Sequence, residues 1–201
     1  MARLLLLLGL VIVAHSPRAQ ECECIWQGAF ADVASTADLI VSASVASAKG
    51  NSIDLAPERT LKGELPAAEL RVWLKARDYC RPAVTEFPQD SRWVFALQRI
   101  DEVPAGGFDP LTPNVSYGRP GDYRLSSCGG FWLKLEENRV KGNLVNAPRW
   151  VRDPKMTPVL LDVVADYVDG KLNRQQLLEA SREDPALREL MLDTRSFLRN
   201  N

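Results

Sequence analysis

Cys22-Glu23-Cys24 is the stretch of sequence around which the rest of the chain is organised. Only two other cysteines occur, Cys80 and Cys128. The two sulfurs of a C-x-C cannot easily bond each other, because one intervening residue in an extended chain holds the β-carbons further apart than a disulfide allows. If the four cysteines form disulfides, each of the two bonds either Cys80 or Cys128, and both pairings stay open at this point. In either pairing, the start of the folded chain is attached to two distant points of the sequence.

The residues before Cys22 have the pattern of a secretory signal peptide. A short basic start is followed by eleven consecutive apolar residues, 4–14, and then by a small residue, Ala19, at which cleavage can occur. Eleven apolar residues are too few for a helix that spans a bilayer. We expect cleavage after Ala19, with cuts one or two residues to either side also compatible. The product would be secreted, either to the extracellular space or to a periplasm.

Removal of residues 1–19 leaves a chain without histidine, since His15 is the only one. It also removes Arg3 and Arg18, which lowers the formal net charge from −1 to −3. Histidine is the commonest general base and metal ligand, and no carboxylate pair stands out, so we expect neither an enzyme nor a bound metal or cofactor. The lack of a basic run argues against nucleic-acid binding. We expect a disulfide-bonded monomer that does not contact a membrane once the signal peptide is removed.

Alternating apolar residues predict a mainly β protein with flanking helices. Residues 69–77 alternate most regularly, and Trp73 falls among the outward-facing side chains. Residues 92–100 contain an unbroken apolar run at 93–97, as in a central strand that is buried on both faces. We expect strands at 39–46, 52–63, 69–77, 92–100, 123–127, 131–136 and 140–144. Short strands within a segment of this length, with helices before and after them, predict a five- to six-stranded antiparallel Greek-key barrel of the OB type.

Helices are expected before and after the barrel strands in the sequence. A short one lies within 26–37. Later, Thr157 is a suitable N-cap before Pro158, and Asn173 with Gln176 three residues on forms a capping box. A third C-terminal helix begins at Asp184. We therefore divide the chain into a signal peptide (1–19), a barrel domain (20–148) and a helical extension packed on the barrel (149–201).

Residues 101–121 are expected to form a long surface loop. The segment contains four prolines and four glycines and shows no periodicity. It includes Asn114-Val115-Ser116, which fits the acceptor pattern for N-glycosylation if the source is eukaryotic.

The cysteines and strands follow one another in a distinctive order. Cys22 and Cys24 come after a signal peptide, 37–41 opens a strand, Cys80 closes the third strand, 91–97 leads into the apolar fourth strand, and 123–128 ends in Cys128. This order resembles the N-terminal domain of the tissue inhibitors of metalloproteinases, within the wider netrin-type family of OB-fold modules, over residues 22 to about 145. The resemblance implies the pairing Cys22–Cys80 and Cys24–Cys128. Each bridge would stabilise the fold by about 4 kcal/mol on the chain-entropy estimate.

The resemblance also implies a function. In that family, the α-amino nitrogen and the carbonyl oxygen of the N-terminal cysteine chelate the catalytic zinc of a metalloprotease and displace its water. The next side chain enters the specificity pocket. A zinc metalloprotease is thus the implied partner, and the residues implied to bind it are Cys22, Glu23, Cys24 and Ile25, flanked by Asp78, Tyr79 and Cys80.

The chain differs from the family in three ways. Cleavage after Ala19 leaves Gln20 and Glu21 before Cys22, whose nitrogen is then an amide. Glu23 stands where the family usually has a small hydroxyl residue, and four cysteines leave no third bridge. We therefore keep a second hypothesis. In it the protein is a non-inhibitory extracellular or periplasmic protein-binding or structural module that uses the loop 101–121 or the outward face at Trp73.

Overall fold

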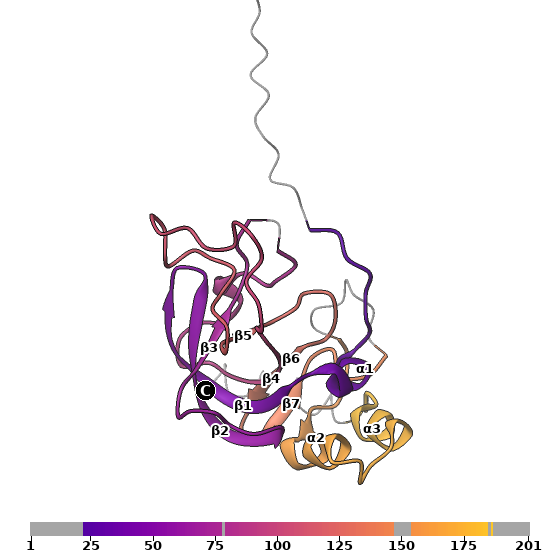
Figure 1. Ribbon diagram of the computed structural model, residues 1–201. Helices are drawn as coiled ribbons and strands as arrows, with labels where there is room; N and C mark the ends of the chain where they lie inside the picture. The colour runs from indigo at the N-terminus through magenta and orange to yellow at the C-terminus, as the bar shows by residue number, and fades with distance from the viewer. Residues whose placement is uncertain (1–21, 78, 147–153, 185, 187–201) are drawn as a thin grey trace, which may run out of the picture.

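Five strands pair edge to edge until the last meets the first, which closes a β-barrel (Figure 1). They are β1 (Leu39–Lys49), β2 (Ser52–Lys62), β3 (Leu70–Trp73), β4 (Arg92–Arg99) and β5 (Tyr123–Arg124). The order around the barrel is β1-β2-β3-β5-β4, and the pairing of β1 with β4 closes the ring. β3 and β5 run parallel, whereas the other neighbouring barrel strands are antiparallel. The predicted OB-type barrel is confirmed, with one parallel pair that the prediction of antiparallel strands did not include.

The computed structural model of the chain describes residues 22–77, 79–146, 154–184 and 186. The predicted signal peptide, 1–19, therefore lies outside the described residues, as does nearly all of the C-terminal helix predicted from Asp184 onward. Within the described residues, no helix has both the length and the apolar composition that a membrane crossing requires.

Three further strands extend the sheet beyond the barrel. They are β6 (Trp132–Glu136), which pairs with β4, then β7 (Arg139–Lys141) and β8 (Val159–Leu160). A tight turn joins β6 to β7, and both of its residues have positive φ, 45° at Glu137 and 64° at Asn138. A two-residue turn with this backbone matches the right-handed twist of the two strands that it joins.

Short helices flank the sheet. Before β1 lie α1 (Phe30–Val33) and the 3-10 turn η1 (Ala34–Thr36), within the predicted range 26–37. Another 3-10 turn, η2 (Val84–Glu86), precedes β4, and α2 (Leu161–Val168) and α3 (Arg174–Ser181) follow β8. The capping box predicted for α3 is confirmed, because Asn173 Oδ1 accepts from the Gln176 amide (3.0 Å) and Gln176 Oε1 accepts from the Asn173 amide (2.9 Å).

The prediction that Thr157 caps a helix is wrong. Residues 159–160 form β8, and α2 begins only at Leu161. Thr157 instead holds the end of α3, since its amide donates to the carbonyl of Ser181 (3.1 Å) and its hydroxyl donates to that of Arg182 (2.7 Å). A polar residue before a proline is as suitable for a tertiary hydrogen bond as for a cap, and the local sequence does not distinguish the two.

Within the part of the chain that the structure describes, the C-terminal helices α2 and α3 contact α1. The hydroxyl of Tyr167 in α2 donates to the carbonyl of Ala31 (2.7 Å), and Arg174 of α3 forms an ion pair with Asp32 (2.6 Å). Leu161 and Leu177 are buried in the same apolar cluster as the barrel core. Helices α2 and α3 therefore cover apolar surface that the sheet would otherwise expose to water.

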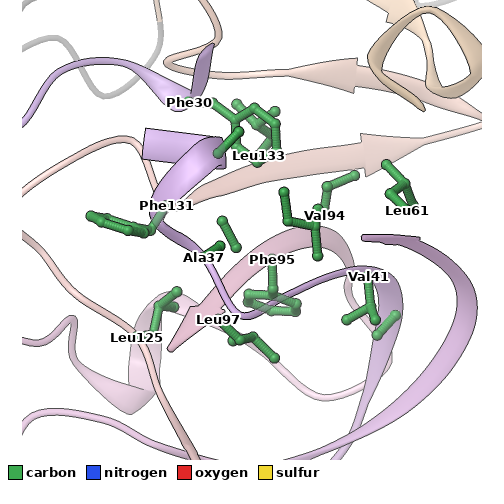
Figure 2. Close-up of a cluster of buried hydrophobic side chains, with 14 of the residues drawn as sticks. Phe30, Ala37, Val41, Leu61, Val94, Phe95, Leu97, Leu125, Phe131 and Leu133 are labelled. Carbon is green, nitrogen blue, oxygen red and sulfur yellow. The ribbon is translucent and has the colours of Figure 1, made fainter. Parts of the chain in front are cut away.

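The centre of β4 is completely buried. Residues Val94 to Leu97 are each 0% exposed, which confirms the predicted burial of this strand on both faces. Figure 2 shows Phe95 in a cluster to which Phe30 of α1, Val41 of β1 and Leu133 of β6 also contribute. One face of β4 lies inside the barrel, and residues of α1 and β6 contribute to the same core. The sequence of β4 is therefore apolar without the alternation of a half-buried strand.

The prediction that Trp73 faces outward is wrong. Its side chain is 2% exposed, and the indole nitrogen donates to Asp122 Oδ2 (2.7 Å). The end of the loop 101–121 lies over the indole, because a Cβ added at Gly118 would be 2.9 Å from the ring. The alternation of β3 is real, but the loop covers the face that alternation assigns to solvent. The hypothesis of an exposed binding face at Trp73 is therefore excluded.

We expect Asp54→Asn to lower the free energy of unfolding by about 1–2 kcal/mol at pH 7. Asp54 on β2 accepts from Arg71 Nε (2.8 Å) and Nη2 (3.0 Å) on β3, and from Ser47 Oγ (2.9 Å). The hydrogen bond from Arg71 is the main reason why the pKa of Asp54 lies below its ordinary value. The stabilisation is therefore complete above the unfolded carboxyl's pKa of about 3.9 and is lost as the pH falls through the lower folded value.

Denaturant unfolding at several pH values measures this effect. The difference between the wild type and Asp54→Asn should shrink steadily below about pH 4. Asp101→Asn is the control, since that carboxylate is exposed and we expect little change at any pH. If the difference in unfolding free energy between the two proteins stays the same at low pH, the charge of Asp54 does not stabilise the pairing of β2 with β3.

Candidate functional site: the stapled N-terminal tip

The N-terminal tip, residues 22–25, is an extended segment whose side chains alternate between protein and solvent. Cys22 and Cys24 are half-buried, whereas Glu23 is exposed and Ile25 is 89% exposed. In an extended chain, neighbouring side chains point to opposite sides. The tip therefore turns its sulfurs toward the barrel and presents one carboxylate and one apolar side chain outward.

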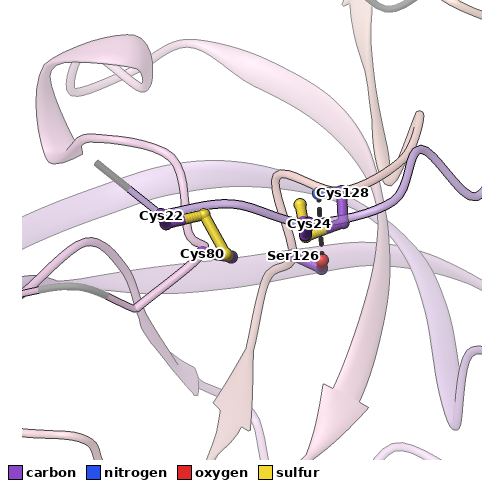
Figure 3. Close-up of a disulfide and its surroundings, with 5 residues drawn as sticks. All are labelled: Cys22, Cys24, Cys80, Ser126 and Cys128. Atoms are coloured by element: carbon purple, nitrogen blue, oxygen red, sulfur yellow. Dashed lines mark hydrogen bonds between the residues drawn. A yellow bond between two sulfur atoms is a disulfide. The ribbon is translucent and has the colours of Figure 1, made fainter. Parts of the chain in front are cut away.

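Two disulfides attach the tip to the barrel (Figure 3). Cys22 is bonded to Cys80 and Cys24 to Cys128, with Cα–Cα distances of 5.2 and 5.8 Å. This is the pairing that the family resemblance implies, and the crossed alternative is excluded. All four cysteines are bonded in this way, as is typical of proteins from an oxidising compartment.

Backbone hydrogen bonds hold the same segments together. The amide of Gln27 donates to the carbonyl of Cys128 (2.7 Å), and the amide of Gly130 donates to that of Gly28 (2.9 Å). Ser127 N–H donates to the carbonyl of Cys80 (3.0 Å), which joins the two segments that carry the partner cysteines. The close approach of these segments requires a glycine at position 130, since a Cβ on Gly130 would lie 2.6 Å from the Phe30 amide nitrogen.

An aromatic cluster with a buried arginine borders the tip. The ring of Tyr79, next to Cys80, packs edge-on against that of Tyr117, with 4.9 Å between centroids. Arg81 is 6% exposed and its guanidinium lies 4.3 Å from the centroid of the Tyr117 ring. Its Nη1 donates to the Tyr117 carbonyl (2.5 Å), and burial lowers the pKa of this arginine from its ordinary value. Cation–π contact and a hydrogen bond to the loop offset part of the cost of burying the charge.

The loop 101–121 is attached to the same end of the barrel as the tip (Figure 1). Besides the contacts of Tyr117, Arg77 Nη1 donates to the carbonyl of Gly106 (2.9 Å). The loop presents three apolar side chains to solvent, namely Phe108, Leu111 (91% exposed) and Val115. Its backbone is thus held in place while its apolar side chains stay free of the core. Asn114, the residue of the glycosylation pattern, is also exposed, whereas Ser116 is buried.

Asn51, in the turn between β1 and β2, is the main polar link between the barrel and this loop. Its Nδ2 donates to the carbonyls of Leu74 (3.0 Å) and Ser116 (2.9 Å), and its Oδ1 accepts from the Ser116 amide (2.9 Å). We expect Asn51→Ala to lower the free energy of unfolding by about 2–4 kcal/mol, because buried backbone groups lose their partners.

Thermal or denaturant unfolding of Asn51→Ala measures that loss, and limited proteolysis should show earlier cleavage within 101–121. Asn114→Ala is the matched control, since the side chain of Asn114 is exposed and only its backbone carbonyl contacts Asn51. We expect it to change the stability by less than about 0.5 kcal/mol. Equal stability of the two variants would contradict the role assigned to Asn51.

The cysteine sulfurs at the tip do not form a metal site. The Sγ atoms of Cys22, Cys24 and Cys80 lie within 4.8 Å of one another, which is a spacing that metal ligands can have. Each of them is part of a disulfide, so none can provide a thiolate.

The structure brings together six of the seven residues predicted to bind a protease. Cys22, Glu23, Cys24 and Ile25 form the tip, and Tyr79 and Cys80 lie beside it. The seventh, Asp78, lies outside the described residues. Sequence reasoning missed Arg81 and Tyr117, which no spacing connects because 36 positions separate them.

No protein-family model matches this chain, and no curated protein or solved structure matches it significantly.

Proposed function

We propose that this protein is a secreted domain, similar to the tissue inhibitors of metalloproteinases, that inhibits a zinc metalloendopeptidase through its N-terminal tip. The observation that carries the proposal is the pairing of Cys22 with Cys80 and of Cys24 with Cys128, which holds an exposed, extended tip on an OB-type barrel. The comparisons with known proteins neither support nor oppose it, so it rests on geometry and chemistry.

The chemistry of the tip suits a catalytic zinc ion. Such an ion has three protein ligands and one position open to water or substrate. If Cys22 is the first residue, its neutral α-amine and its carbonyl oxygen can both reach the metal. Two disulfides within three residues limit the motion of these atoms, so little conformational entropy is lost on binding.

The outward side chains of the tip would determine the target. Glu23 is exposed, and burying its carboxylate in an apolar pocket would cost several kcal/mol. We therefore expect a protease whose specificity pocket contains a basic side chain. Ile25, at 89% exposure, would supply apolar contact two residues further along the cleft.

The test compares two preparations of the same mature domain. One begins at Cys22 and the other at Gln20, so that only the first has a free α-amine on Cys22. With the catalytic domain of a matrix metalloproteinase and with thermolysin as probes, we expect the first to inhibit at least about 100-fold more strongly, equivalent to roughly 2.8 kcal/mol of binding free energy.

Matched circular dichroism spectra of the two preparations are the control for folding.

A third preparation, Glu23→Ser starting at Cys22, should inhibit proteases with apolar specificity pockets more strongly than the unsubstituted domain that starts at Cys22. Equal inhibition by the Cys22 and Gln20 forms would contradict zinc chelation by the α-amine. No inhibition by any form would remove the inhibitor proposal for these two protease classes.

One observation favours the second hypothesis, a non-inhibitory binding module. Phe108, Leu111 and Val115 are exposed on a loop that Asn51, Arg77 and Arg81 hold in place. Apolar side chains on an ordered loop are typical of protein-binding surfaces. If a purified extracellular partner binds the Gln20 form as tightly as the Cys22 form, and Leu111→Ser weakens both equally, this hypothesis replaces the first.

A further inference from the structure

The sulfur of Cys24 lies beside a disulfide to which it does not belong. Cys24 is bonded to Cys128, yet its Sγ is within 4.8 Å of the Sγ atoms of both Cys22 and Cys80. Figure 3 shows the two disulfides next to each other along the tip. At this separation a small side-chain rotation brings a thiolate into contact with a neighbouring disulfide, which is the geometric requirement for thiol–disulfide exchange.

The four cysteines differ in how exposed to solvent they are. Cys22, Cys24 and Cys80 are half-buried, whereas Cys128 is 5% exposed. Exchange depends on access to the sulfur that is attacked. A small thiol therefore reaches the Cys22–Cys80 bridge more easily than it reaches Cys128.

The segments that carry the sulfurs are also held together without the disulfides. Ser127 N–H donates to the Cys80 carbonyl (3.0 Å), and Gln27 N–H donates to the Cys128 carbonyl (2.7 Å). Opening one bridge therefore leaves Cys24, Cys80 and Cys128 on neighbouring backbone. The released thiolate stays next to the remaining disulfide and need not wait for a chance encounter.

We propose that Cys22, Cys24 and Cys80 form a thiol–disulfide exchange site that reacts with small-molecule thiols. In the first step, a thiolate RS⁻ attacks Cys22 Sγ, so that an RS–Cys22 bond forms, the Cys22–Cys80 bond breaks and Cys80 leaves as a thiolate. In the second step, the Cys80 thiolate attacks Cys24 Sγ. The Cys80–Cys24 bond forms, the Cys24–Cys128 bond breaks and Cys128 leaves as a thiolate that takes up a proton.

A second equivalent of RS⁻ completes the reaction. It attacks the small-molecule sulfur of the mixed disulfide, releases the Cys22 thiolate and leaves as RSSR. Two thiols are thereby oxidised to one disulfide, and the protein gains two electrons as the thiols of Cys22 and Cys128. The remaining bridge joins Cys24 to Cys80, so the first residue of the tip is released while the chain stays cross-linked. This inference does not depend on the proposed protease inhibition.

Disulfide mapping after limited reduction tests the first step and the second together. The oxidised mature protein is treated with one to a few equivalents of dithiothreitol, quenched in acid, alkylated and digested, and the single-bridge species is analysed by mass spectrometry. We expect the Cys24–Cys80 bridge, with Cys22 and Cys128 alkylated, in amounts comparable with the native Cys24–Cys128 bridge. Its absence, or direct passage to the fully reduced chain, would overturn the proposal.

A variant isolates the second step without any reductant. In Cys22→Ser the thiol of Cys80 is unpaired from the outset, and we expect alkylation to divide between Cys80 and Cys128 as the bridge to Cys24 moves between them. Cys80→Ser is the matched control. Its unpaired thiol is Cys22, and labelling should stay on Cys22 because the two cysteines of a C-x-C cannot easily bond each other, although their sulfurs also lie within 4.8 Å of each other. Labelling of Cys80 alone in Cys22→Ser would contradict the exchange. If Cys22→Ser does not fold, the mapping of the wild type still decides.

Discussion

The double variant Cys24→Ser/Cys128→Ser is expected to lose about 4–5 kcal/mol of the free energy of unfolding. The bridge joins positions that are 104 residues apart, and a cross-link that closes so long a loop removes much conformational entropy from the unfolded chain. It also holds the segment that leads into α1, whose Phe30 is fully buried in the core. The expected loss approaches half of the stability of a typical domain.

Denaturant unfolding monitored by tryptophan fluorescence measures this loss. Cys22→Ser/Cys80→Ser is the matched comparison, since it removes the other bridge, which closes a loop of 58 positions, and should cost about 4 kcal/mol. The two losses should therefore be similar. A loss below about 1 kcal/mol for either pair would mean that the backbone hydrogen bonds of the tip already confine the unfolded chain or that the bridge is strained.

Phe95→Ala is expected to lower the free energy of unfolding by about 3–5 kcal/mol. Phe95 is 0% exposed at the centre of β4, and its ring lies 5.4 Å from that of Phe87, centroid to centroid. β4 pairs with β1, β5 and β6, so a cavity here lies next to three other strands and cannot be filled without shifting the barrel. Truncation removes apolar contact and leaves that cavity.

The control for Phe95→Ala uses the same substitution on the surface. Phe108 is 49% exposed on the loop 101–121, and Phe108→Ala should change the stability by less than about 1 kcal/mol. Thermal unfolding of the two variants at one pH gives the comparison. Similar losses would show that the loop packs on the core more tightly than its exposure indicates. In that case Phe108 would be a poor choice of contact residue for a partner.

The two disulfides separate the stability of the barrel from the function proposed for the tip. Most of the core, including β4 and its neighbours, does not involve residues 22–25. We therefore expect Cys22→Ser/Cys80→Ser to remain folded at room temperature while the tip loses its fixed position. Inhibition by a domain that begins at residue 22 should then fall far more than the change in stability would explain.

The barrel could be predicted from sequence because its signals are local. Alternation marks β1 and β3, a continuous apolar run marks β4, and the tight turn at 137–138 joins β6 to β7. The capping box at Asn173 likewise depends on residues three apart. Patterns of this kind reflect which side chains are buried, and burial determines the order of apolar and polar residues along each element.

The sequence by itself determined which elements form, that four cysteines must pair across the chain, and, through an inferred resemblance, which pairs they make. Only the tertiary structure decided that the loop 101–121 covers Trp73, that Thr157 holds α3 instead of starting α2, and that Arg81 packs on Tyr117. It also decided that the sulfur of Cys24 lies beside the other disulfide. The physical reason is that hydrophobic alternation and helix capping depend on residues a few positions apart. The burial of a side chain under a loop, a cation–π contact and the approach of two disulfides depend instead on how distant segments meet in space.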